Sequence, residues 1–341
     1  MTPAIPNPRD PRDPRSPDRH RTKPAASRPP ATGSATPATP AAPRSPAARS
    51  LPGRNPAKVR AAGLRRRLTG PGVIRVSGAH DALSARVAEE AGFDAVWASS
   101  LAISAARGLP DMSLLSMTDY LQAASNISDV CTIPVIADCD TGFGGTLNVA
   151  YMVRQYEAAG VAAVCIEDKV FPKRNSFLGA GQRLEDADVF ARKIEIAKRT
   201  QRNEDFFVIA RTEAAIAGSG IGDALRRAHR YVDAGADAIL MHSKSPEPDE
   251  VLGFLAKWGR RAPVVVIPTT YYTWHVDDAA KAGVAMVIYA NHALRAAVRS
   301  MKQVLDEVLT AGSSVPVEDR IAPMRDIFGL QRVDEWLALE P

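Results

Sequence analysis

Ala159-Gly160-Val161-Ala162-Ala163-Val164 is one copy of a short phrase that recurs along this chain and decides its fold. Three further copies cover Ala91–Val96, Ala234–Ile239 and Ala282–Val287. In every copy a helical pattern precedes the glycine, which takes the position where helices end in left-handed backbone, and an apolar run follows. Repeated helix–glycine–strand units predict parallel strands that are joined by crossover helices.

Outward from this phrase, apolar runs predict eight strands, and the segments between them have helical periodicity. Eight such units over about 250 residues match the size of a (β/α)₈ TIM-like barrel, so we predict that α/β fold for residues 59–341. An open doubly wound sheet is the alternative, but no Gly-x-Gly-x-x-Gly follows the first predicted strand. The predicted strands are Val73–Val76, Ala95–Ala98, Pro134–Asp138, Ala162–Ile166, Phe206–Ala210, Ala238–Met241, Val264–Ile267 and Met286–Tyr289. The predicted helices are Ala82–Glu90, Thr118–Ser128, Leu147–Ala158, Ala187–Gln201, Gly222–Ala234, Pro248–Trp258, Val276–Ala282 and a long one from Asn291 to about Ala311.

Residues 1–58 differ in composition from everything that follows. They contain 15 of the 26 prolines and no aromatic residue, so they cannot bury enough apolar surface to offset the entropy of ordering. We predict a disordered, basic extension rich in Pro, Ala and Arg. Its arginines would suit a nucleic acid or another anionic surface. A solvated extension without a specific partner is the commoner case, so we expect no nucleic-acid partner.

Charge and cysteine content place limits on the class of protein. The first 70 residues hold 15 Lys and Arg against 3 Asp and Glu, and the rest holds 28 against 35, so the body is mildly acidic. No apolar run is long enough for a secretory signal or a membrane span. Cys131, Cys139 and Cys165 fit neither a zinc spacing nor a disulfide framework. We therefore expect reduced thiols and a cytoplasmic protein without a membrane partner.

The chemistry of a (β/α)₈ barrel lies where its strands end, and carboxylates gather at two neighbouring strand ends of this chain. Asp138 and Asp140 occupy alternate positions, so they face the same side of an extended segment. Glu167 follows the next predicted strand. Oxygen ligands in this number suit Mg²⁺, so we expect these three residues to hold that ion. Aspartates that cap a helix or solvate a loop are the plainer interpretation.

Basic side chains end the following strands. Arg211 follows the fifth predicted strand, where its guanidinium can bind a carboxylate or phosphate in bidentate fashion. An ion pair with Glu213 is the structural alternative. His242 follows the sixth strand, where taken alone it is equally a hydrogen-bonded core histidine or a ligand. Beside Arg211 it becomes a candidate donor to an anionic oxygen. Asp111 lies in a long loop after the second strand, where spacing alone indicates a turn or a helix cap.

The segment Glu167–Ser176 reads Glu-Asp-Lys-Val-Phe-Pro-Lys-Arg-Asn-Ser, an acid pair followed by a polar loop. On this segment the chain resembles the phosphoenolpyruvate mutase branch of the isocitrate lyase/phosphoenolpyruvate mutase superfamily. The resemblance runs from about Val73 to Glu335 and implies a Mg²⁺-dependent (β/α)₈ barrel that interconverts phosphoenolpyruvate and phosphonopyruvate. Supporting phrases are Asp138–Gly144, Ile209–Ala214, Ala234–Lys244, Pro268-Thr269, Ala290–His292 and Ile327–Gln331.

The resemblance also implies how the strand-end residues act. Asp138 would ligate the metal directly, and Asp140 and Glu167 would act through metal-bound water. Arg211 and His242 would hold the anionic end of the substrate. Together these implied roles place the metal and the substrate side by side at the carboxyl ends of the strands.

Further implied roles fall to the loops. Lys173 would lie on a mobile loop that shields the reaction from water, and Asn175 and Ser176 would contact the phosphoryl group. Asp111 matches an aspartate that acts either as a phosphoryl-accepting nucleophile or as an electrostatic guide, and loose phosphoryl transfer leaves both roles open. The backbone N–H groups of Ser100 and Leu101 would bind the pyruvyl oxygens beside Trp97 and Ser99.

Two positions decide between activities within the resemblance. Ser100 stands where the family usually has Gly, so the backbone N–H is kept but the pocket shape can change. Phosphonopyruvate hydrolases also resemble this chain but tend to have Thr in place of Asn175, and Thr leaves more room for water than an amide. We therefore predict a mutase. The alternatives are a hydrolase, a carboxyphosphonoenolpyruvate mutase and, from another class, a non-catalytic protein that works through its basic extension.

The residues themselves argue against two other functions: the cleavage reaction of the lyase branch, and a non-catalytic role. The lyase branch of the superfamily has a Lys-Lys-Cys-Gly-His segment, and the equivalent stretch of this chain has no Cys. A barrel without catalysis would be expected to have lost some of its strand-end acids, and none of the matched acids is missing. The helices after Asn291 resemble those that family members exchange between subunits. We therefore expect a homodimer or homotetramer. The reaction that the resemblance implies predicts a role in phosphonate biosynthesis.

Overall fold

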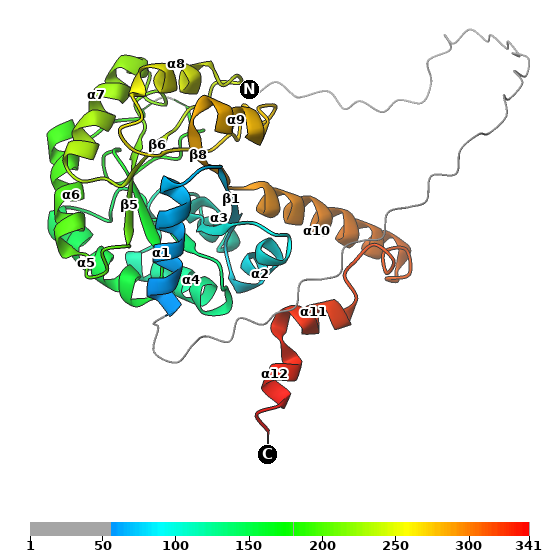
Figure 1. Cartoon of the computed structure of the whole chain (residues 1–341). Coiled ribbons are helices and arrows are strands. Elements are labelled where there is room, and N and C mark those ends of the chain that lie inside the picture. The colour runs from blue at the N-terminus through cyan, green and yellow to red at the C-terminus, as the bar shows by residue number, and fades with distance from the viewer. Residues whose placement is uncertain (1–55, 180, 341) are drawn as a thin grey trace, which may run out of the picture. The chain divides into compact units, whose positions relative to one another are not determined.

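Eight parallel strands close into a barrel in the computed structural model, which describes residues 56–179 and 181–340 (Figure 1). These residues belong to one compact unit, Ser50–Pro341. Neighbouring strands pair in chain order, and β8 pairs with β1 to close the barrel. The predicted fold is confirmed. The strands are β1 Ile74–Ala79, β2 Ala95–Ala98, β3 Val135–Asp138, β4 Ala163–Glu167, β5 Phe207–Thr212, β6 Ala238–Met241, β7 Val264–Val266 and β8 Val284–Tyr289.

Helices join successive strands and form the outer layer of the barrel (Figure 1). Each predicted helix is present, with ends that differ by a few residues. The connecting helices are α2 Ala82–Glu90, α3 Ser100–Ala106, α4 Met117–Val130, α5 Thr146–Ala158, α6 Ala187–Thr200, α7 Gly220–Asp233, α8 Asp249–Trp258 and α9 Val276–Ala282.

The glycine of the recurring phrase ends the helices as predicted. Gly160 follows α5 with a φ of 78°, and Gly235 follows α7 with a φ of 99°. A residue with a Cβ would pay about 1–2 kcal/mol for left-handed backbone, so glycine at these points lets the chain turn from helix into strand.

Side chains on each strand alternate between two apolar cores. On β4, Ala163 and Cys165 belong to the core inside the barrel, while Val164 and Ile166 belong to the core between the strands and the helices. Both faces of the sheet are therefore buried and apolar. Charged groups gather instead at the strand ends, where the chain leaves the sheet.

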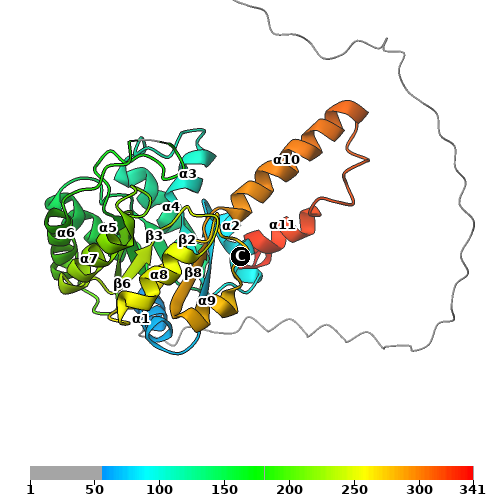
Figure 2. The same ribbon diagram turned by 90° about the horizontal axis from the view of Figure 1, so that it is seen from above.

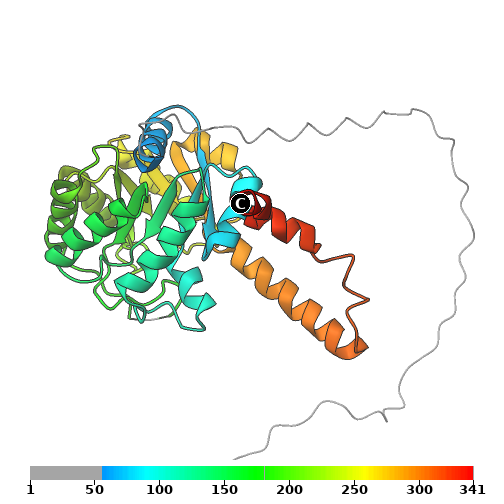
Figure 3. The same cartoon turned by 90° about the horizontal axis from the view of Figure 1, so that it is seen from below.

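Helix α1 (Pro56–Thr69, blue in Figures 1 and 3) closes the amino-terminal mouth of the barrel and was not predicted from the sequence. The predicted disordered extension lies outside the described residues except for its last three, which begin this helix. Arg60 donates to the carbonyl oxygens of Cys131 and Gly160 (3.0 and 3.2 Å), in loops that lead into strands. The apolar side chains at helical spacing, which were the available signal, are buried against the barrel core: Ala61, Leu64 and Leu68.

Helix α3 occupies part of the segment that we predicted as a long loop after the second strand. Its seven residues are too few to give a clear helical period. Ser99 caps it, and the Ser99 Oγ accepts from the Ala102 N–H at 3.3 Å. This short helix brings Ser100 and Leu101 to the end of β2.

The carboxyl-terminal segment leaves the barrel and then returns to it. Helix α10 (His292–Ala311) projects away from the barrel, the chain turns back so that α11 (Met324–Gln331) contacts α2, and α12 (Val333–Leu337) follows (Figure 2). No residue of α10 is buried. One side of α10 is apolar and exposed, through Val298, Met301, Leu305 and Leu309. None of the helices within the described ranges has the length and hydropathy needed to cross a membrane.

Candidate active site

The carboxyl ends of the strands surround a cavity of about 50 Å³. Ser100, Asp140 and Glu167 are buried and contact residues that line it. Residues from the ends of seven strands, β2 to β8, and from two loops therefore meet where the barrel fold places chemistry. The other predicted site residues all line the cavity: Trp97, Ser99, Leu101, Asp111, Asp138, Lys173, Asn175, Ser176, Arg211 and His242.

The three predicted metal ligands lie at one edge of the cavity. Asp138 is the last residue of β3, and the Ser100 Oγ donates to its Oδ2 at 2.9 Å. The Asp140 N–H donates to the other Asp138 oxygen at 3.4 Å. Glu167 ends β4, and its N–H donates to the Asp140 carbonyl oxygen at 2.7 Å. Backbone pairing between adjacent strand ends thus fixes the spacing of these acids.

Cations of the protein lie among these acids. The Lys173 Nζ is 2.7 Å from Asp140 Oδ1 and 2.9 Å from Asp111 Oδ1. The Arg211 Nε is 3.3 Å from Glu167 Oε2. Among the residues that the structure describes, no three His, Cys, Asp or Glu side chains are grouped closely enough to hold a metal ion. The two basic side chains take the place that a shared cation would have between the carboxylates.

The carboxylates are nevertheless incompletely satisfied. Glu167 Oε1 is buried and accepts no hydrogen bond, which is costly for a carboxylate oxygen. Burial raises the pKa of Asp138, and it raises the pKa of Asp140 to about 7 even though Lys173 opposes the shift. Burial also opposes the charge of Lys173, but Asp140 and Asp111 outweigh it and hold the Lys173 pKa well above its ordinary value. The possible metal ligands are therefore closely spaced carboxylate oxygen atoms, which are hard ligands.

Glu213 organises the cationic side of the cavity. Its Oε1 accepts from Arg211 Nε at 2.5 Å and lies 2.6 Å from His242 Nδ1. Arg211 Nη2 is 2.7 Å from the same His242 nitrogen. Burial disfavours the charge of Glu213, but Arg211 and His242 outweigh it and keep its pKa well below the usual range. Burial and then Arg211 lower the pKa of His242, whereas Glu213 opposes this shift.

Arg211 has the ion pair that we weighed from the sequence, and its other role, the binding of an anionic group, stays a prediction. It makes the predicted ion pair with Glu213 and also lines the cavity. Its guanidinium is held in place by the pair, which leaves a fixed positive charge beside the cavity. Such a charge suits a carboxylate or phosphate group.

The loop that follows β4 covers the cavity, which Lys173, Asn175 and Ser176 line. Lys169 and Leu184 form an isolated antiparallel bridge at its base. Asn175 Nδ2 donates to Asp111 Oδ2 at 2.7 Å, and Ser176 Oγ donates to Glu213 Oε2 at 2.7 Å. Since Lys173 is also buried among the acids, three polar residues of the loop are bonded to acids of the site.

Lys169 was not predicted as a site residue, and Glu213 was predicted only as a possible ion-pair partner of Arg211. The Lys169 Nζ donates to Ser176 Oγ at 2.6 Å and to the Arg174 carbonyl oxygen at 2.9 Å, and it lies 2.9 Å from Glu213 Oε2. The available signal was alternation, because Lys169 and Glu213 each lie two residues beyond a predicted site residue in an extended segment. The cavity is completed by residues to which no role was given: Phe177, Ile267, Thr269, Ala290 and Asn291.

The family model for phosphoenolpyruvate phosphomutase matches residues 64–309. The chain is 46% identical over 258 residues to a phosphoenolpyruvate phosphomutase of Tetrahymena pyriformis, which covers 75% of this chain and 86% of the relative. A solved phosphoenolpyruvate phosphomutase from Streptomyces platensis subsp. rosaceus is 50% identical, with a TM-score of 0.81 over 82% of this chain and 97% of that one. A solved phosphonopyruvate hydrolase in complex with oxalate and Mg²⁺ is 40% identical, with a TM-score of 0.78 over 82% and 98%.

Proposed function

The chain belongs to the phosphoenolpyruvate phosphomutase family, and from this premise we propose that it interconverts phosphoenolpyruvate and phosphonopyruvate. The reaction moves a phosphoryl group between an oxygen and a carbon of one molecule. One observation supports this activity above others: the loop amide of Asn175 is held 2.7 Å from Asp111 over a cavity that also contains Arg211 and His242. An amide at this position can hydrogen-bond to a phosphoryl group while the group is transferred, and it leaves little room for a water molecule.

The fixed side of the cavity would bind the part of the substrate that does not move. Arg211 and His242 are held by Glu213 and would bind the anionic end. Trp97 and Ser99 would flank the pyruvyl group. Backbone N–H groups at the start of α3, those of Ser100 and Leu101, would contact its oxygens.

The loop side would bind the part that moves. Asn175 and Ser176 would contact the phosphoryl oxygens, and Lys173 would neutralise negative charge while it closes the loop. Lys173 outweighs burial and holds the pKa of Asp111 below its usual value, so Asp111 is ionised. An ionised Asp111 is compatible both with a nucleophile and with an electrostatic guide for the phosphoryl group.

We also propose that Asp138, Asp140 and Glu167 hold Mg²⁺. The buried Glu167 Oε1 without a hydrogen bond and the crowding of hard oxygen atoms fit such an ion, and the hydrolase relative was solved with Mg²⁺. When bound, Mg²⁺ would stabilise the negative charge that develops on the pyruvyl oxygen. The residues of the chain would then have to orient the substrate and exclude water.

The activity is tested by incubating phosphonopyruvate with the protein and Mg²⁺ and recording ³¹P NMR spectra. Formation of phosphoenolpyruvate is expected. Inorganic phosphate together with pyruvate would instead assign the hydrolase activity, which is the second candidate because the 40% identical hydrolase shares the fold over 82% of the chain. A spectrum without turnover would rule out both activities.

Asn175→Thr is expected to shift the products from phosphoenolpyruvate toward phosphate and pyruvate. The shorter side chain loses the bond to Asp111, worth about 1.5–3 kcal/mol for a charged partner, and leaves room for a water molecule. The ratio of the products by ³¹P NMR measures the change, and about tenfold is expected. Arg174→Ala is the control, because Arg174 lies on the same loop but is exposed. An unchanged ratio in Asn175→Thr would show that the amide does not choose the product.

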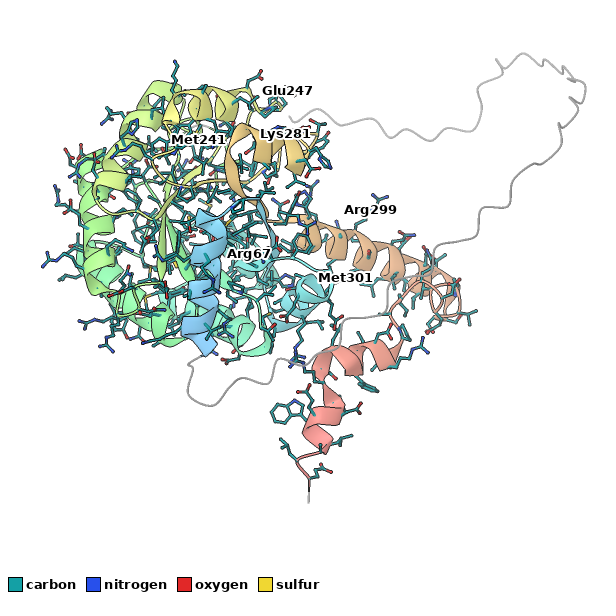
Figure 4. The ribbon with its side chains drawn as sticks, in the orientation of Figure 1. Arg67, Met241, Glu247, Lys281, Arg299 and Met301 are labelled. Atoms are coloured by element: carbon teal, nitrogen blue, oxygen red, sulfur yellow. The ribbon has the colours of Figure 1, made fainter. Side chains whose placement is uncertain are left out.

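We further propose that the protein assembles as a homodimer or homotetramer through α10, α11 and α12, which would be exchanged between subunits. The exposed apolar side of α10 supports this, because Met301 is 55% exposed and Leu305 is 66% exposed. A surface helix of a globular protein normally packs such an apolar stripe against the rest of the protein. Arg299 projects from another side of the helix (Figure 4). The three buried free cysteines support a reducing compartment such as the cytoplasm, and the product supports a role in phosphonate biosynthesis.

The double substitution Met301→Asp with Leu305→Asp is expected to convert the assembly to monomers of 36.5 kDa. Charged groups on the apolar side would have to be buried in the interface, which is unfavourable by several kcal/mol. Sedimentation velocity measures the mass, and Arg299→Ala is the control on another side of α10. The proposal fails if the unsubstituted protein already sediments as a monomer.

A further inference from the structure

The side chain of Ser100 makes two hydrogen bonds that none of the proposed roles uses. It is 1% exposed, and its Oγ donates to Asp138 Oδ2 at 2.9 Å and accepts from Lys173 Nζ at 3.1 Å. A hydroxyl has one proton to donate, a carboxylate accepts and an ammonium group donates. The direction of this short chain is therefore fixed, from Lys173 through Ser100 to Asp138.

The chain of bonds joins three parts of the molecule. Asp138 ends β3, Ser100 begins α3, and Lys173 lies on the loop that covers the cavity. The backbone N–H of Lys173 also donates to Ser113 Oγ at 3.2 Å. The loop is thus bonded by neutral hydroxyl groups as well as by carboxylates, through Ser100 to α3 and through Ser113 to the loop that follows α3.

The contribution of Ser100 differs in kind from that of the other Lys173 partners. Asp111 and Asp140 attract Lys173 as charges, and any cation that approaches them competes with the lysine. A hydroxyl oxygen carries no net charge, so its bond to Lys173 is less sensitive to such competition. Ser100 can therefore hold the loop closed while the acids beside it have other partners.

We propose that Ser100 is a positioning residue, which stabilises the closed loop by joining Lys173 to Asp138 and so keeps water from the phosphoryl group in transit. The effect on water rests on the proposed function, whereas the effect on the loop does not. Removal of the hydroxyl leaves an ammonium proton and a carboxylate oxygen without their partner. The open loop then becomes more populated.

Trypsin measures this population directly, because it cleaves after Lys173 and Arg174 and Lys173 is 4% exposed when the loop is closed. Where opening is fast relative to cleavage, the cleavage rate follows the fraction of open molecules. Mass spectrometry of new amino termini at Arg174, which report cleavage after the buried Lys173, gives that rate. Cleavage after Arg174 is not counted, because that side chain is exposed in the closed loop. Ser100→Ala is expected to raise it about tenfold, as the loss of one bond to charged groups predicts.

Ser104→Ala is the matched control. Ser104 lies on the same helix, is equally buried at 1% and bonds through its Oγ to the hydroxyl of Tyr120 at 2.9 Å rather than to the loop. Its cleavage rate is expected to equal that of the unsubstituted protein. Ser100→Cys, which keeps a weak donor and acceptor of similar size, is expected to give an intermediate rate and serves if Ser100→Ala does not fold.

Equal cleavage rates for the unsubstituted protein and the Ser100 variants would overturn the proposal. An equal increase in Ser104→Ala would overturn it as well, because a general loosening of α3 would then explain the result. With phosphonopyruvate, the Ser100→Ala enzyme is expected to release a larger share of phosphate in the ³¹P NMR assay. If no protein converts phosphonopyruvate, the proposed function fails while the cleavage rates still decide the role of Ser100 in the loop.

Discussion

Asp138→Asn is expected to lower Mg²⁺-dependent turnover of phosphonopyruvate by about 10³-fold or more. The substitution removes one negative charge from the proposed metal ligands without changing the size of the side chain. A metal ion contributes several kcal/mol of charge stabilisation in the transition state, and about 1.4 kcal/mol corresponds to a factor of ten. The amide oxygen can still accept from Ser100, so the closed loop is retained. Turnover by ³¹P NMR and Mg²⁺ affinity by calorimetry measure the loss.

Asp168→Asn is the control for this prediction. Asp168 adjoins Glu167 and is fully buried, but its carboxylate accepts from Tyr231 at 2.6 Å and from the Glu213 N–H at 2.8 Å, outside the cavity. Its loss is expected to lower the midpoint of thermal unfolding and to leave Mg²⁺ affinity unchanged. Full activity of Asp138→Asn with unaltered Mg²⁺ binding would remove Asp138 from the metal site.

Arg211→Lys is expected to lower kcat/KM about 10²- to 10⁴-fold. A lysine keeps the charge that Glu213 needs, so the fold is preserved. Its single ammonium group cannot contact Glu213, His242 and a substrate anion at once, as the planar guanidinium can. Loss of two bonds to charged groups, at about 1.5–3 kcal/mol each, accounts for the magnitude. Steady-state kinetics with phosphonopyruvate measure it.

Arg227→Lys provides the comparison, because Arg227 is also 8% exposed but lies on α7 and bonds to Asp223 and to the Glu185 carbonyl oxygen. Its kinetics are expected to match those of the unsubstituted enzyme, with any loss confined to thermal stability. Comparable kinetic losses in both variants would mean that Arg211 supports the fold and has no special relation to the substrate.

The barrel could be predicted because its signals are local and repeated. A glycine after a helix and an apolar run after that glycine are properties of neighbouring residues, and four copies of this phrase among eight predicted strands leave few architectures. The same logic placed Asp138, Glu167 and Arg211 at strand ends, and the structure brings all three to one edge of the barrel. Helices α1 and α3 were not predicted. Helix α1 begins in a basic, proline-rich region, and α3 is too short to show a helical period.

The side-chain pairing within the site could not be predicted in the same way. Lys173 is 62 residues from Asp111 and 33 from Asp140 along the chain, and only the folded loop places its ammonium group between them. Glu213 was visible as an ion-pair partner of Arg211, but its contact with His242 depends on the register of β5 and β6. Such contacts depend on the tertiary structure, and local sequence patterns do not predict them.

Helix α1 has a practical consequence for work with this enzyme. It begins at Pro56 beside the loops that enter the strands, at the mouth of the barrel opposite the cavity. A reporter, an affinity tag or a solid support attached ahead of this helix would therefore be joined to the closed end of the barrel. Immobilised in this orientation, the enzyme would keep its substrate entrance turned toward the solution.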